Sequence, residues 1–354
     1  MPGKKAEKPR FHLSDYLILA PFVAQKLGFK DWGQMLRRLA DVPEGTASDG
    51  YTYMYHELLT TPGRSIPDET LATYDRNIRE YVASIGRKRG DGFRLKYFQY
   101  LAVLFTEIYL DVYFQGPNSL MRELNDALES GLSRRPRLGV AYGKRDLQKI
   151  AYAMATGSGK TLLLHINYLQ FQRYNHGRNA IVVDNVILIA PSEEMVTQHL
   201  DELLASDIPA GIFKGETPGP FVASESVHVK VIDVFKLKLP EDKKGEGVTF
   251  NVDIFGEKNL LFVDEGHKGN RSEERKWKQV RQKLARSGFT FEYSATFSQV
   301  IGVKSIEDVD ENALLDEYSK AILFDYSYKY FHGDGYGKEF FVLNLKKFEF
   351  EELD

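Results

Sequence analysis

The sequence has no cysteine among its 354 residues. This absence excludes disulfide bonds and metal sites built from thiolates. A chain without cysteine is compatible with a reducing compartment, and we expect the protein to be cytoplasmic.

Long apolar runs are absent too. No window of about eighteen residues is apolar and free of charge, so we expect no transmembrane helix and no membrane partner. An excess of one charge is also missing, because 47 Lys and Arg face 50 Asp and Glu, a formal net charge of −3. Such a balance does not by itself indicate nucleic-acid binding, but a local basic groove would suffice for it.

The chain is long enough for two or three compact units. Residues Phe11 to Ile85 have a helical, aromatic-rich pattern interrupted by prolines, with no catalytic motif. A glycine-rich, basic stretch from Gly86 to Gly92 then indicates a joint. We therefore predict an α-helical N-terminal region at residues 1–90, of unknown role.

Two more helices are predicted at Leu95 to Phe114 and at Met121 to Leu132. Beyond them, short apolar runs alternate with helical stretches, which is typical of a parallel sheet covered on both faces. The sequence therefore predicts an α/β fold with a mostly parallel sheet. The predicted strands are Ile150 to Met154, Val186 to Ala190, Val227 to Phe235, Leu260 to Val263 and Phe289 to Tyr293.

The segment MATGSGKT, residues 154–161, follows a predicted strand and opens a predicted helix. This is the context of a phosphate-binding loop, in which glycines let backbone N–H groups turn toward phosphates at a helix N-terminus. We expect Lys160 to bridge the β- and γ-phosphates of ATP and the Thr161 hydroxyl to bind Mg²⁺. Nucleotide-binding candidates in the loop are Thr156, Gly157, Ser158, Gly159, Lys160 and Thr161.

A second motif, the acidic pair Asp264 and Glu265, follows the apolar strand Leu260 to Val263. Parallel strands carry ligands at their carboxyl ends, where the phosphate loop also lies. Asp264 can hold Mg²⁺, and Glu265 can polarise the water that attacks the γ-phosphate. The two motifs together predict an ATP hydrolase with Lys160, Asp264 and Glu265 as catalytic residues.

The pair ATGSGKT and DEGH, with Ser294-Ala295-Thr296 after the next strand, resembles the superfamily 2 helicases and translocases, the DEAD/DEAH-box group in the wide sense. Within that group the chain is most similar to the motor (res) subunits of type III restriction enzymes. A methionine before the glycine loop, here Met154, is common in that branch. The resemblance covers roughly residues 92–299. It implies a RecA-like ATP-binding domain at residues 91–310.

The resemblance also implies roles for residues outside the two ATP motifs. His267 would couple the ATP site to a partner domain, and Ser294 and Thr296 would link hydrolysis to strand movement. Pro191, Ser192 and Gln198 would contact the nucleic-acid backbone.

Gln99 lies in the segment FRLKYFQ, residues 93–99, which resembles an adenine-reading element. There a glutamine amide would pair with the adenine edge, and Phe93 or a neighbour would pack on the base. The alternative for Gln99 is an ordinary polar position on an amphipathic helix. More residues than usual separate Gln99 from the glycine loop, which requires an inserted helix.

The resemblance implies a second RecA-like domain that supplies arginines to the ATP cleft. Nothing between Phe297 and Asp354 matches such a domain, and its pattern Q-x-x-G-R-x-x-R does not occur. We therefore interpret residues 311–354 as a strand-rich exit segment toward an absent second motor domain. As a truncated gene, a fragment or a split motor, the chain is expected to hydrolyse ATP slowly and not to unwind duplexes.

The predicted function is the ATP-binding half of an ATP-dependent DNA helicase or translocase of restriction or phage-defence type. Expected partners are DNA, a second RecA-like domain in cis or in trans, and a methyltransferase or another defence subunit. A non-motor ATP-binding scaffold and an RNA helicase fragment remain alternatives. Basic residues on the predicted helix Glu273 to Arg286, Arg281 among them, either line a nucleic-acid path or form the more common solvated helix face.

Overall fold

The computed structural model describes residues 13–89, 92–131, 141–215, 228–240, 249–265, 271–297 and 309–337. In α9 (Arg271–Leu284) and α11 (Val309–Ala321) the described side chains begin at Lys278 and Ala313. Among the helices in these ranges, none combines the length and apolar character that crossing a membrane requires.

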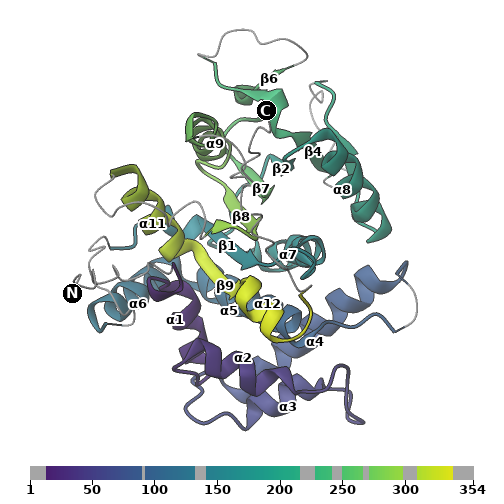
Figure 1. Ribbon diagram of the computed structural model, residues 1–354, viewed down its shortest axis with the longest axis vertical. Helices are drawn as coiled ribbons and strands as arrows, with labels where there is room; N and C mark the ends of the chain where they lie inside the picture. Colours follow the sequence, from purple (N-terminus) through teal and green to yellow (C-terminus); the bar gives the residue numbers. More distant parts are fainter. Residues whose placement is uncertain are drawn as a thin grey trace, which may run out of the picture.

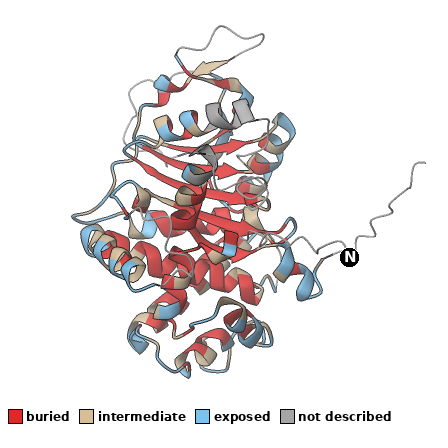
Figure 2. Cartoon of the chain, turned by 60° about the vertical axis from the view of Figure 1, so that its left-hand side comes forward, coloured by how far each residue is buried: buried red, intermediate tan, exposed pale blue. Residues whose placement is uncertain are grey.

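A seven-stranded sheet forms the centre of the molecule (Figures 1 and 2), in the order β3-β4-β2-β7-β8-β1-β9. Every pairing within it is parallel. The α/β fold predicted from the sequence is therefore confirmed. The strands are β1 (Lys149–Met154), β2 (Asn185–Ala190), β3 (Ala210–Ile212), β4 (Val229–Asp233), β7 (Asn259–Asp264), β8 (Phe289–Ser294) and β9 (Ile322–Tyr326).

Alternate residues of each strand enter different cores, because successive side chains point to opposite faces of a sheet. On β7, Leu260 and Phe262 belong to the large core, which also contains residues of α5 (Tyr97–Gln115) and α7 (Lys160–Tyr174). Leu261 and Val263 of the same strand enter a second core with Val280 of α9. Burial on both faces explains why these strands appear in the sequence as unbroken apolar runs.

The predicted N-terminal helices are present and gather on one side of the sheet (Figure 1). Their buried side chains share one core with α5, α7 and strand residues such as Phe262 and Tyr326. The helical region is therefore packed into the α/β domain. Its helices are α1 (Leu19–Lys26), α2 (Trp32–Ala40), α3 (Tyr53–Leu59) and α4 (Asp68–Gly86), and α6 (Pro117–Glu129) follows α5.

The sheet continues past residue 310, where the predicted exit segment begins. Helix α11 leads into β9, which pairs in parallel with β1 and completes the sheet at that edge. Helix α12 (Tyr328–Gly333) then brings Phe331 beside the glycine loop, 3.8 Å from the position a Cβ would take on Gly157. Residues 309–333 thus belong to the α/β domain, and residues 338–354 of the predicted exit segment lie outside the described residues.

The remaining described elements are a small second sheet, several 3₁₀ turns and helix α8. A small two-stranded sheet pairs β5 (Leu237–Lys238) with β6 (Phe250–Asn251). Four 3₁₀ turns, η1 (Leu13–Asp15), η3 (Asp146–Gln148), η4 (Val234–Lys236) and η5 (Val252–Phe255), join larger elements. Helix α8 (Glu193–Ala205) follows β2.

Candidate nucleotide-binding site

The glycine loop lies between the end of β1 at Met154 and the start of α7 at Lys160. Gly157 and Gly159 have φ angles of +83° and +93°, which a residue with a Cβ rarely adopts. At Gly159 a Cβ would also come within 2.5 Å of Gln99 Nε2. The loop conformation therefore requires glycine at these positions, as expected for a loop whose backbone wraps an anion.

Lys160 and Glu265 form an ion pair that joins the two ATP motifs. The Lys160 Nζ lies 3.1 Å from the Glu265 Oε1, and each side chain is only 12% exposed. Lys160 Nζ also donates a weaker bond, of 3.4 Å, to the Met154 carbonyl. The structure therefore brings the phosphate loop and the acidic pair together at the carboxyl edge of the sheet.

Asp264, at the end of β7, is held by a histidine that sequence reasoning missed. Its Oδ2 lies 3.0 Å from Nε2 of His199, a residue of α8 that is 1% exposed. Its Oδ1 is buried and has no hydrogen-bond partner among the described residues, and the same holds for His199 Nδ1. His199 lies between the buried Val196 and Leu203 of α8. A histidine on the apolar side of a helix was the only signal for it in the sequence.

Glu265 is oriented by the segment that follows β8. Its two carboxylate oxygens accept hydrogen bonds from Ser294 Oγ at 3.0 Å and from Ala295 N at 3.2 Å. The Thr296 N–H in turn donates to Ser294 Oγ at 2.9 Å. Glu265 itself has a φ of +50°, uncommon for a residue other than glycine. The Ser-Ala-Thr segment thus contacts the acidic pair directly, so a movement of either one would alter the hydrogen bonds between them.

Gln99 reaches the glycine loop although 59 positions separate it from Ser158. Its Nε2 donates to the Ser158 carbonyl at 2.9 Å, and its Oε1 accepts from Lys96 N at 2.9 Å at the start of α5. Both ends of the amide are thus used by backbone groups. This contact places Gln99 at the loop, and its adenine-reading role stays a prediction.

The residues predicted to contact nucleic acid lie around the start of α8. Ser192 caps this helix by accepting a hydrogen bond from Met195 N at 3.3 Å. Gln198 is exposed on the helix, and Pro191 is half-buried. Their nucleic-acid contacts stay predictions, and His267 lies outside the described residues.

The site suits Mg²⁺ held partly by a nucleotide. Asp264 offers a buried oxygen without a partner among the described residues, and Thr161, predicted to bind the same ion, is half-buried in the first turn of α7. No group of three or more His, Asp or Glu side chains forms a complete metal site in the described part of the chain. Mg²⁺ commonly takes one or two protein ligands and completes its shell with phosphate oxygens and water.

A second buried histidine, His165 of α7, lies behind the loop. Burial, together with the nearby Arg89 and His199, lowers its pKa to about 3, so the ring is neutral at physiological pH. Its Nδ1 is 2.9 Å from Ser206 Oγ, which also accepts a hydrogen bond of 3.0 Å from Arg89. His165 therefore packs as a neutral core residue and ties α7 to the end of α8.

Part of the chain matches a known protein family. The family of the type III restriction enzyme, res subunit, matches residues 119–299, slightly more than half of the chain. The matched region contains the glycine loop, the acidic pair and the Ser-Ala-Thr segment. A search of curated proteins finds no match.

Proposed function

Because this chain belongs to the family of the type III restriction enzyme res subunit, we propose that it is the ATP-binding half of an ATP-dependent DNA helicase or translocase. The family is one of helicase-like ATP-binding motors. A role in restriction or phage defence, and hydrolysis of ATP by this chain, are parts of the proposal.

The ion pair between Lys160 and Glu265 carries the proposal. A lysine that binds phosphates and a carboxylate that activates water must face the same phosphate, and here their charged atoms are 3.1 Å apart. The glycines at positive φ add a phosphate cradle. Asp264 Oδ1, which has no hydrogen-bond partner among the described residues, adds an oxygen that can bind a metal ion.

Each residue has a definite task in this proposal. A bound γ-phosphate competes with Glu265 for Lys160, which leaves the carboxylate able to accept a proton from the attacking water. Ser294 and the Ala295 N–H hold that carboxylate in place. Asp264 and Thr161 would hold Mg²⁺, which neutralises charge on the phosphates when bound.

In this proposal the other parts of the motor are supplied by partner domains or subunits. We propose that a second RecA-like domain, in cis or in trans, supplies arginines worth roughly 10³–10⁵ in rate. DNA would cross the surface around Pro191, Ser192 and Gln198, and a methyltransferase or other defence subunit would direct the motor.

A nucleotide-binding and ATPase assay tests the proposal. We expect Lys160→Ala to abolish ATP binding, and Glu265→Gln to retain it while losing at least about tenfold in turnover. Lys30→Ala removes an exposed lysine of the helical region and should change neither. An intact chain that does not bind Mg·ATP would refute the proposal.

Adding nucleic acid separates the alternatives. Stimulation by DNA supports the DNA motor, and stimulation by RNA alone identifies an RNA helicase fragment. ATP binding without hydrolysis, unchanged by DNA, by RNA and by a supplied second motor domain, would identify a non-motor scaffold.

A further inference from the structure

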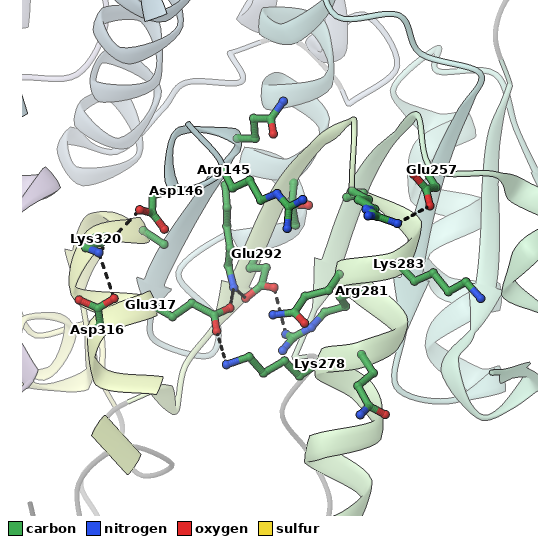
Figure 3. Close-up of a pocket in the computed structure, with 18 of the residues that line it drawn as sticks. Arg145, Asp146, Glu257, Lys278, Arg281, Lys283, Glu292, Asp316, Glu317 and Lys320 are labelled. Atoms are coloured by element: carbon green, nitrogen blue, oxygen red, sulfur yellow. Dashed lines mark hydrogen bonds and ion pairs between the residues drawn. The ribbon is translucent and has the colours of Figure 1, made fainter. Parts of the chain in front are cut away.

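A cavity of about 730 Å³ (Figure 3) lies at the amino end of β1, whereas the proposed nucleotide site lies at its carboxyl end. It is lined by residues of η3, by Lys149 at the start of β1, by Thr290 and Glu292 of β8, and by side chains of α9 and α11. Lys149, the first residue of β1, faces this cavity, whereas the glycine loop follows the other end of the same strand. Five steps of about 3.3 Å separate the ends, so the two sites lie roughly 17 Å apart.

Five charged side chains form a connected cluster on the wall of this cavity. Lys149 Nζ contacts Glu292 at 3.0 Å and Glu317 at 2.5 Å. Lys278 Nζ reaches the other oxygen of Glu317 at 2.8 Å, and Arg281 Nη1 reaches the other oxygen of Glu292 at 3.0 Å. Both carboxylates are therefore saturated by cations from two elements.

The cluster contains three cations and two carboxylates, so its net charge is positive. Burial opposes the charge of Lys149 and Arg281, but the facing carboxylates outweigh it and raise the pKa of both. Burial likewise opposes the charge of Glu317, but Lys149 and Lys278 outweigh it and hold its pKa well below the usual range. These directions of the pKa keep Lys149, Arg281 and Glu317 charged at physiological pH.

Within the described side chains this cluster carries one positive charge in excess, and an anion in the cavity would offset it. The Arg281 side chain is 8% exposed and that of Lys149 is 16%, so water reaches the cluster mainly around Lys278, which is 28% exposed. The basic helix α9 is thus not simply a solvated face, because Arg281 is buried in this cluster.

A second set of charges marks the far end of the cavity. There Lys320 lies 3.0 Å from Asp316 and 3.6 Å from Asp146, one cation for two carboxylates. Arg145 is exposed beside this set, and no ion pair to it is found within the described residues. Over the whole lining, seven Lys and Arg side chains face five Asp and Glu, and one of the seven, Lys283, is paired with Asp253 outside the lining. One positive charge therefore remains in excess among the described side chains.

We propose that this cavity binds a small molecule that carries a phosphate group. The volume lies in the range of small-ligand pockets and would hold a molecule of nucleotide size. Arg145, before η3, and Lys278, Gln279 and Gln282 of α9 line the cavity with side chains that can donate hydrogen bonds. Arginine and lysine side chains bind phosphate through short, charge-assisted hydrogen bonds.

Calorimetry with pyrophosphate tests the proposal in a Lys160→Ala background, where the glycine loop has lost its phosphate-binding lysine. We expect this variant to bind one pyrophosphate at constant ionic strength. Adding Lys278→Gln should weaken binding at least tenfold. Its cluster retains two cations and two carboxylates, so the chain should fold, as circular dichroism would verify.

Lys283→Gln in the same background is the matched control. Lys283 also lines the cavity from α9, but it pairs with Asp253 at 2.6 Å and points away from the cluster in Figure 3. We expect less than a twofold effect. Absence of pyrophosphate binding, or equal weakening by both substitutions, would overturn the proposal. So would tighter binding of a single-stranded oligonucleotide than of pyrophosphate, because the site would then belong to a nucleic-acid path.

Discussion

At the scale of single residues, the two oxygens of Asp264 differ in their surroundings. His199 Nε2 is hydrogen-bonded to one oxygen at 3.0 Å, and the other oxygen is buried without a described partner. A carboxylate that is held on one side presents its second oxygen in a single direction. Partners of this kind set the orientation of metal-binding carboxylates and influence metal affinity.

We predict that His199→Ala raises the Mg²⁺ concentration needed for half-maximal ATPase activity by about 10–100-fold. The reason is the loss of orientation of Asp264, because His199 itself would not touch the nucleotide. Steady-state rates over a Mg²⁺ titration measure this effect.

His199→Gln is the rescue variant, since its Nε2 can donate in the place of the histidine Nε2. It should recover part of the Mg²⁺ affinity, and nucleotide binding without Mg²⁺ should stay unchanged in both variants. Equal loss of metal-free nucleotide binding in the alanine and glutamine variants would show that His199 only supports the fold.

At the scale of elements, β9 carries a buried carboxyl group on Asp325, its penultimate residue. Asp325 is 6% exposed, and burial raises its pKa from 3.8 to about 6 although the Ser327 side chain and N–H stabilise the carboxylate. The folded protein thus keeps this proton to a higher pH than the unfolded chain does. Between about pH 4 and 6 the unfolded chain releases it first, so unfolding becomes easier as pH rises.

Asp325→Asn should remove this pH dependence. A shift of about two pKa units corresponds to about 3 kcal/mol, so the variant should exceed the original chain in free energy of unfolding by up to that amount at pH 7, and by little at pH 4. Asparagine keeps the oxygen that accepts from Ser327 N at 3.1 Å. Urea unfolding of both chains at the two pH values measures the difference, and a constant difference would contradict the assignment.

At the scale of the whole molecule, the helical region and the sheet are joined through Trp32. Its ring lies 5.5 Å from Phe105 of α5 and 5.3 Å from Phe324 of β9, and its Nε1 donates to the Asp325 carbonyl at 2.9 Å. These contacts link α2, α5 and the edge of the sheet. Two regions that share a core are expected to unfold together.

Trp32→Ala should therefore lower the free energy of unfolding by about 3 kcal/mol and leave a single transition. Hydrogen exchange of the helical region and of the sheet, followed separately, should show the same loss of protection. Tyr53→Ala, at a side chain that is 40% exposed, is the control and should change stability little. Early unfolding of residues 13–89 alone would contradict a shared core.

Local motifs and periodic patterns were sufficient to predict the parallel sheet, the glycine loop and the acidic pair. These features depend on residues close together in the chain, whose backbone geometry and burial follow from their own types: glycines for positive φ at 157 and 159, and apolar runs for strands buried on both faces. The family could be predicted for the same reason.

Only the tertiary structure decided which distant residues meet. Gln99 reaches the glycine loop, His199 holds Asp264, Arg281 lies buried beside Glu292, and β9 joins the sheet. Apart from Gln99, whose segment FRLKYFQ resembles an adenine-reading element, these residues were not predicted from a local pattern, because each contact depends on how helices and strands pack. The sequence alone therefore determined which residue types meet at the proposed nucleotide site, and packing decided what surrounds and orients them.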